Sequence, residues 1–153
     1  MAKNRGKQFE QLIREAFEKV PWVSVDRIPD QTMRYRGAQN VCDFIVYRYP
    51  NLFYIECKTV HGNTLPFTNI KDNQWNGLLN KSKIPGVYAG VICWWVDKDV
   101  TRFIPITELE TMKKNNYKSV AWNTVCLAYD IKGKKKRVLY EYDMEQFFEE
   151  VTK

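Results

Sequence analysis

The run from Val87 to Val96, VYAGVICWWV, is almost wholly apolar. Successive side chains of a strand point to opposite faces of a sheet, so a strand that is apolar throughout is buried on both faces. The run is also shorter than the roughly 18 apolar residues that a membrane-spanning helix needs. It therefore predicts a central strand with further layers of structure on both sides of the sheet.

The segments around this strand show two periodicities. Apolar residues recur with the period of a helix from Phe9 to Val20, and Pro21 ends that helix. Further helices are predicted at 69–80, from a capping box that begins at Thr107, and at 143–151. Strands are predicted at 22–28, 41–49, 52–60, 101–106 and 137–142. This order predicts an α/β fold in which a mixed central sheet is flanked by helices.

The composition is typical of one folded domain. The chain has 153 residues, an ordinary domain length, and its 44% hydrophobic and 14% aromatic content excludes intrinsic disorder. No apolar run is long enough to cross a membrane, and the first residues lack the apolar segment of a secretory signal. We therefore expect residues 1–153 to form a single domain that acts in the cytoplasm.

The net charge and the spacing of the cysteines limit which macromolecules and metal ions the chain is expected to bind. Lys and Arg number 24 against 18 acidic residues, a net charge of +6. This balance is compatible with nucleic acid as a partner, and equally with a basic domain that binds no anion. The four cysteines lack C-x-x-C spacing and are expected to be free thiols, while His61 is the single histidine. A metal ion would therefore be held mainly by oxygen atoms, as Mg²⁺, Mn²⁺ and Ca²⁺ are.

Two charged residues interrupt the apolar strand predicted at 52–60. Glu56 and Lys58 are two residues apart, so they share one face of that strand. Pro50-Asn51 predicts a tight turn, which makes the two strands beside it antiparallel neighbours. The turn thereby brings Asp43, on the preceding strand, close to Glu56 and Lys58.

Two carboxylates and an ammonium group at a sheet edge suit the metal-assisted hydrolysis of a phosphodiester. The carboxylates hold a hard cation that acidifies a bound water, and the lysine stabilises charge that develops in the transition state. Glu10 lies on the rim of the buried face of the first helix, from which a carboxylate can reach the sheet. Two alternatives stay open: a cross-strand ion pair that fixes the register of two strands, and an ordinary acid near a helix start.

The pattern of Glu10, Asp43, Glu56 and Lys58 resembles the PD-(D/E)xK nuclease superfamily, and in more detail the RecU family of Holliday junction resolvases. The matching pieces, in family order, are Asn4–Gly6 with Phe9-Glu10, Asp43-Phe44, Ile55–Thr59, Asn63–Phe67, Asp72–Gln74, Arg102–Pro105 and Lys118–Val120. They cover nearly the whole chain. The resemblance implies a restriction-endonuclease-like αβββαβ core with an acidic residue on its first helix.

The resemblance also implies roles for the site residues. Asp43 and Glu56 would bind Mg²⁺ or Mn²⁺, and Gln74 would join the metal shell directly or through water. Lys58 would stabilise the transition state, with Glu10 as a supporting acid. One position departs from the family, because Val41 stands where family members often carry a threonine that is a proposed ligand. This departure fits a divergent copy, for example one encoded by a phage or a mobile element acting in a bacterial host.

Contacts with DNA are expected from basic and aromatic residues. These residues are Arg5, Arg34, Tyr35, Arg36, Lys134, Lys135 and Lys136. Arg5 would meet a phosphate, and the tip at 34–36 belongs to a short stalk-like hairpin near 30–40 that would enter the junction. The lysines are predicted to lie in a loop between strands, where they would contact the phosphate backbone. Both segments can alternatively be solvated turns.

These observations favour a magnesium-dependent, structure-selective DNA endonuclease. The resemblance implies a homodimeric Holliday junction resolvase that makes paired symmetric nicks in four-way junctions during recombination and repair. Two other interpretations remain. One is a nuclease of the same fold that acts on flap, nicked or mismatched DNA, and the other is a non-catalytic DNA-binding relative. Metal dependence separates enzyme from binder, and a comparison of junction with duplex substrates separates the two enzymes.

Overall fold

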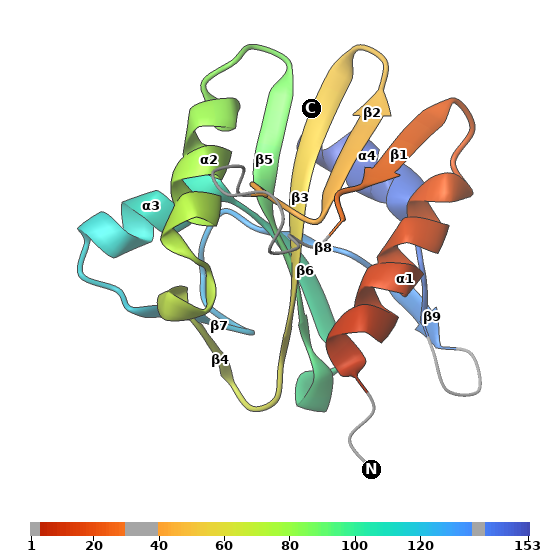
Figure 1. Cartoon of the computed structure of the whole chain (residues 1–153). Coiled ribbons are helices and arrows are strands. Elements are labelled where there is room, and N and C mark those ends of the chain that lie inside the picture. The colour runs from red at the N-terminus through yellow and green to blue at the C-terminus, as the bar shows by residue number, and fades with distance from the viewer. Residues whose placement is uncertain (1–3, 30–39, 136–139) are drawn as a thin grey trace.

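The computed structural model describes residues 4–29, 40–135 and 140–153. Its centre is a six-stranded sheet of order β1-β2-β3-β5-β6-β8, in which β3 and β5 run parallel and the other neighbours run antiparallel (Figure 1). The strands of this sheet are β1 (Val23–Arg27), β2 (Phe44–Arg48), β3 (Asn51–Val60), β5 (Val87–Trp95), β6 (Val100–Pro105) and β8 (Tyr129–Asp130). Two small antiparallel ladders join β4 (Thr64–Pro66) to β7 (Ser119–Ala121) and β9 (Gly133–Lys135) to β10 (Tyr140–Tyr142).

Helices cover both faces of the sheet, which confirms the predicted layered arrangement (Figure 1). One face packs against α1 (Arg5–Glu18) and α4 (Met144–Val151), and the other packs against α2 (Asp72–Ser82) and α3 (Ile106–Lys114). Two short 3-10 helices complete the elements, η1 (Phe67–Asn69) and η2 (Val96–Lys98). No helix in the described ranges is long and apolar enough to cross a membrane.

β5 is the central strand that the apolar run predicts. Its side chains alternate between the two cores, with Ile92 and Trp94 on the α1 side and Val91, Cys93 and Trp95 on the α2 side. β5 is joined to the parallel strand β3 by a crossover that contains α2, the usual connection between parallel neighbours. All four cysteines of the chain are free, as the sequence predicts.

α1 follows the predicted pattern, and the helix begins before Phe9, the first apolar residue of that pattern. Asn4 caps the helix, because its side-chain oxygen accepts a hydrogen bond from the backbone amide of Lys7 at 3.2 Å. Phe9, Ile13 and Phe17 are fully buried and pack against the sheet. Their spacing places the polar side of the helix in solvent, with the Glu10 side chain at the border between the two.

The capping box predicted at Thr107 is wrong. α3 begins at Ile106, after Pro105, and Ile106 is fully buried in the α2 core. The carboxylate of Glu110 does not return to the start of the helix, because it accepts a 2.7 Å hydrogen bond from the indole nitrogen of Trp75. A contact between two helices has therefore replaced the local cap.

Two strand predictions also differ from the structure. The strand predicted at 41–49 begins at Phe44, since the segment before it turns away from the ladder. Lys134 and Lys135, predicted in a loop, lie on β9 and pair with Glu141 and Tyr140 of β10. Their side chains remain exposed, so the pairing leaves them available to an anion. Lys136 lies outside the described residues.

Candidate active site

β3 extends beyond the start of its neighbour β2, and carboxylates gather at that step in the sheet. The last residue pair between the two strands is Phe44 with Ile55. Just beyond it, the amide of Asp43 donates to the carbonyl of Ile55 at 3.1 Å, and the carboxylate of Asp43 accepts from the amide of Cys57 at 2.8 Å. The Asp43 side chain thus takes the place of a strand neighbour. The predicted proximity of Asp43 to Glu56 is confirmed.

Glu56 and Lys58 project from the same face of β3. Cys57, between them, belongs to the α1 core, so alternation directs its two neighbours to the opposite face. The ammonium nitrogen of Lys58 lies 3.1 Å from Oε2 of Glu56. The Glu56 side chain is only 3% exposed, and its Oε1 has no hydrogen-bond partner among the described residues. One oxygen of a buried carboxylate is therefore open to a ligand.

Glu10 reaches this cluster from α1, where Arg27 at the end of β1 holds it. Nη2 of Arg27 lies 3.3 and 3.4 Å from the two carboxylate oxygens of Glu10. Nη1 of Arg27 donates to the carbonyl of Ile28 at 2.6 Å, and the amide of Ile28 donates to the carbonyl of Asp43 at 2.8 Å. The carboxyl groups of Glu10 and Asp43 lie close enough to shift each other's pKa. Arg27 thereby links the helix to the backbone of Asp43, just before β2.

Sequence reasoning missed Arg27. The residue stands 17 positions from Glu10, and nothing in the periodicity of either segment relates the two. Their contact depends on how α1 lies across β1, which only the packed structure shows. A basic residue at the end of an edge strand, two positions before Pro29, is the sole signal that the sequence offers.

Burial raises the pKa of all three carboxyl groups. It raises the pKa of Glu10 to about 7 and the neighbouring Asp43 adds to the effect, while Arg27 opposes it. Burial and the charge of Glu56 raise the pKa of Asp43 to about 6. Burial also raises the pKa of Glu56, against the pull of Lys58. The three groups therefore keep their protons to a higher pH than exposed carboxyl groups do.

The residues at this step fit a hard divalent cation. Asp43 and Glu56 supply carboxylate oxygens, and the unpaired Oε1 of Glu56 is a buried acceptor without a donor. No group of three or more His, Cys, Asp or Glu side chains in the described ranges is placed to hold a metal ion together. Mg²⁺ needs no such group, because it is commonly bound through one or two carboxylates and keeps several waters.

Gln74 is not joined to the carboxylates by any contact within the described residues. Its side-chain oxygen accepts from the backbone amide of Lys71 at 3.4 Å, at the start of α2. The same helix packs on the segment that leads to Asp43: the Asn73 amide donates to the carbonyl of Asn40, and a Cβ at Gly77 would touch Val41. Gln74 therefore lies on the helix beside the site, and its role as a metal ligand stays a prediction.

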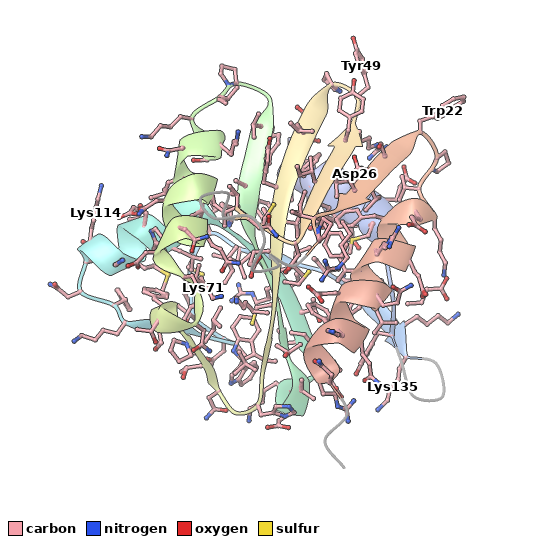
Figure 2. All side chains as sticks on the ribbon, in the orientation of Figure 1. Trp22, Asp26, Tyr49, Lys71, Lys114 and Lys135 are labelled. Atoms are coloured by element: carbon pink, nitrogen blue, oxygen red, sulfur yellow. The ribbon has the colours of Figure 1, made fainter. Side chains whose placement is uncertain are left out.

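The residues expected to contact DNA are dispersed. Arg5 is exposed at the first position of α1, and Lys134 and Lys135 are exposed on β9 (Figure 2 labels Lys135). The tip residues Arg34, Tyr35 and Arg36 lie outside the described residues. All of these DNA contacts remain predictions.

Comparisons with known proteins support the fold. No protein-family model and no curated protein matches the chain. The chain is similar in structure to Hjc of Archaeoglobus fulgidus, a Holliday junction resolvase from an archaeal hyperthermophile, with a TM-score of 0.51 and 17% sequence identity. The alignment covers 67% of this chain and 78% of that one. The predicted restriction-endonuclease-like α/β fold is thus confirmed, while membership of the RecU family in particular stays a prediction.

Proposed function

We propose that this chain is a metal-dependent endonuclease that acts on branched DNA, with the four-way junction as its substrate. The observation that carries the proposal is the buried carboxylate of Glu56, which has one unpaired oxygen and lies beside Asp43 and Lys58. A buried charge is costly unless it is paired or binds a ligand, so a purely structural cluster would be expected to pair fully. The likeness to a resolvase supports junctions as the class of substrate.

Each side chain of the cluster has its own role in the proposed mechanism. Asp43 and Glu56 would hold Mg²⁺ or Mn²⁺, which when bound neutralises phosphate charge and acidifies a water molecule. Lys58, oriented by Glu56 at 3.1 Å, donates hydrogen bonds to the charge that develops on the phosphate oxygens. Glu10, held by Arg27, lies beside Asp43 and would help to fix the position of that carboxylate. Gln74 would complete the metal shell from α2.

A homodimer is part of the proposal. A four-way junction presents two equivalent strands, and paired symmetric nicks need two sites related by a twofold axis. Two copies of this chain would supply the two carboxylate clusters. Such an enzyme would act in DNA recombination and repair.

The decisive experiment compares a labelled mobile four-way junction with a linear duplex of the same arm sequences. Each is incubated with the protein in Mg²⁺, Mn²⁺ or EDTA, and the products are mapped on a denaturing gel. We expect paired nicks in the junction in both metals, none in EDTA, and little cutting of the duplex. Asp43→Asn and Glu56→Gln should abolish cleavage and keep junction binding.

Glu149→Gln is the matched control, because it makes the same chemical change at an exposed position of α4. It should cut like the parent protein. Flapped and nicked duplexes of the same sequence are included as further substrates, and equal cutting of either would replace the junction as the specific substrate. Junction binding without cleavage in either metal would overturn the proposed enzyme activity and leave a DNA-binding protein.

A further inference from the structure

A cleft of about 650 Å³ opens between α1 and the edge strand β1. Its helix wall carries Lys7, Glu10, Gln11 and Arg14, and its strand wall includes Asp26 and Arg27. Figure 2 shows Asp26 on β1, beside α1. The two walls belong to neighbouring elements of one core, so the cleft is formed by the fold itself.

The cleft leads directly to the carboxylate cluster. Glu10 belongs to both, since it lines the cleft and lies close enough to Asp43 for that carboxyl to raise its pKa. Phe44, which follows Asp43, lines the cleft as well. A chain lying in the cleft would therefore pass beside the proposed metal ligands.

The donors on the helix wall form a row. Lys7, Gln11 and Arg14 are four and then three residues apart, a spacing that places them on one face of a helix. At roughly 1.5 Å per residue the row is about 10 Å long. The row is therefore long enough to meet neighbouring phosphates of one DNA strand.

The existing contacts of these donors leave them able to meet phosphate. Arg14 pairs with Glu18 at 2.9 Å and Gln11 donates to Glu15 at 2.9 Å, but both contacts are exposed to solvent. Exposed pairs of this kind contribute roughly 0–1 kcal/mol, so an anion can replace them readily. Of the two acids that line the cleft, Glu10 is already contacted by Arg27, and Asp26 pairs in register with Ile45, whose side chain packs against the α2 core. Asp26 therefore points away from α1, and phosphates would follow the basic residues of the helix wall.

We infer that this cleft takes the sugar–phosphate backbone of one DNA strand and guides it to the carboxylate cluster, with Lys7 and Arg14 as the phosphate contacts. The inference rests on the proposed function in that DNA is the substrate. It adds the path of the strand and two residues that sequence reasoning did not select.

The test is the binding of a fluorescent four-way junction in EDTA, measured by anisotropy from about 50 to 200 mM salt. The double variant Lys7→Ala/Arg14→Ala removes two positive charges from the cleft. The matched control Lys83→Ala/Lys114→Ala removes two exposed charges from the other flank, where Figure 2 shows Lys114 far from α1. Both variants change the net charge equally, so any difference between them reports the position of the charges. Alanine favours the helical conformation, and a thermal melt verifies that each variant is folded.

The cleft variant should bind roughly tenfold more weakly at the lowest salt, and the slope of log K against log salt should fall by about 1.8. The control should stay within roughly twofold with an unchanged slope. Equal losses in the two double variants would overturn the inference.

This experiment is independent of the proposed enzyme activity, since EDTA prevents any metal-dependent step. A parent protein that binds through the cleft but cuts no DNA would support the inference and refute the nuclease. A parent protein that cuts junctions, together with a cleft variant that binds as tightly as its control, would support the nuclease and refute the inference.

Discussion

Glu56 is a charged residue inside a strand whose other residues on either side are mostly apolar. It is 3% exposed, and only one of its two oxygens is paired among the described residues. Burial raises its pKa and those of the neighbouring Asp43 and Glu10. In a protein without function at this site, an apolar residue here would be more stable. The destabilised cluster is the expected signature of a binding or catalytic site.

Glu56→Gln should stabilise the metal-free protein. The substitution removes a buried charge and keeps the shape, and the gain should be about 1 kcal/mol, or a rise of about 3 °C in Tm. The measurement is a thermal melt in EDTA, with Glu149→Gln as an exposed control that should not shift. A fall in Tm would mean that the pair with Lys58 contributes more than the burial costs.

Lys58→Met should act on stability and catalysis together. It leaves Glu56 buried without its ammonium partner, which should destabilise the fold by about 2 kcal/mol. Cleavage should fall by roughly 10²–10³-fold, because the positive group near the reacting phosphate is gone. The double variant Lys58→Met/Glu56→Gln separates the two effects: it should regain the stability and stay inactive. A double variant as unstable as Lys58→Met would disprove the electrostatic explanation.

At the scale of elements, the site exists because β3 continues beyond the point at which its pairing with β2 stops. The ladder between them stops at Phe44 and Ile55, and the freed amide of Cys57 is taken by the carboxylate of Asp43. The other edge of β3 stays paired to β5 as far as Val60. The step is thus rigid on one side and open on the other, which suits a site that must keep its geometry and admit a substrate.

The contact between β5 and β6 should not tolerate a side chain at Gly90. A Cβ there would overlap the carbonyl oxygen of Ile104 and come within 2.8 Å of the Phe103 ring, and both belong to the fully packed interior. Gly90→Ala should destabilise the protein by about 3 kcal/mol, measured by chemical denaturation. Gly6→Ala is the control, since its Cβ would have no contact closer than 3.4 Å. Equal midpoints for the two variants would mean that β6 moves aside freely.

At the scale of the whole molecule, one chain presents one carboxylate cluster in the described ranges. α1, β1, β3 and the segment just before β2 all contribute to it, so the cluster depends on the packing of α1 on the sheet. Under the proposed function each cluster would cut one strand, and paired cleavage would need a second copy.

The protein should sediment at twice the 18.2 kDa mass of one chain. Analytical ultracentrifugation over a range of micromolar concentrations, with and without junction DNA, measures this directly. A dimer in both conditions supports symmetric cleavage. A single-chain mass that persists on the junction would leave an enzyme that nicks one strand at a time.

Much of the fold could be predicted because it rests on local patterns. The buried face of α1 and the alternation of β3 follow from the periodicity of the backbone, which a few residues suffice to show. The same alternation placed Glu56 and Lys58 on one face, and the turn at Pro50-Asn51 placed Asp43 near them. The cap of α3 could not be predicted this way, because Glu110 is taken by Trp75, 35 residues away.

The sequence by itself determined the long elements α1, α2, β2, β3, β5 and β6 and the proximity of Asp43, Glu56 and Lys58, because these depend on separations of a few residues or on one tight turn; the short strands β4, β7, β8 and β9 were not predicted. The tertiary structure alone decided that Arg27 holds Glu10, that Gln74 turns to the backbone of Lys71, and that a cleft runs along α1. Such contacts join distant segments. Their geometry follows from where strands end and how helices lie on the sheet, which is the sum of many small packing terms that no local pattern records.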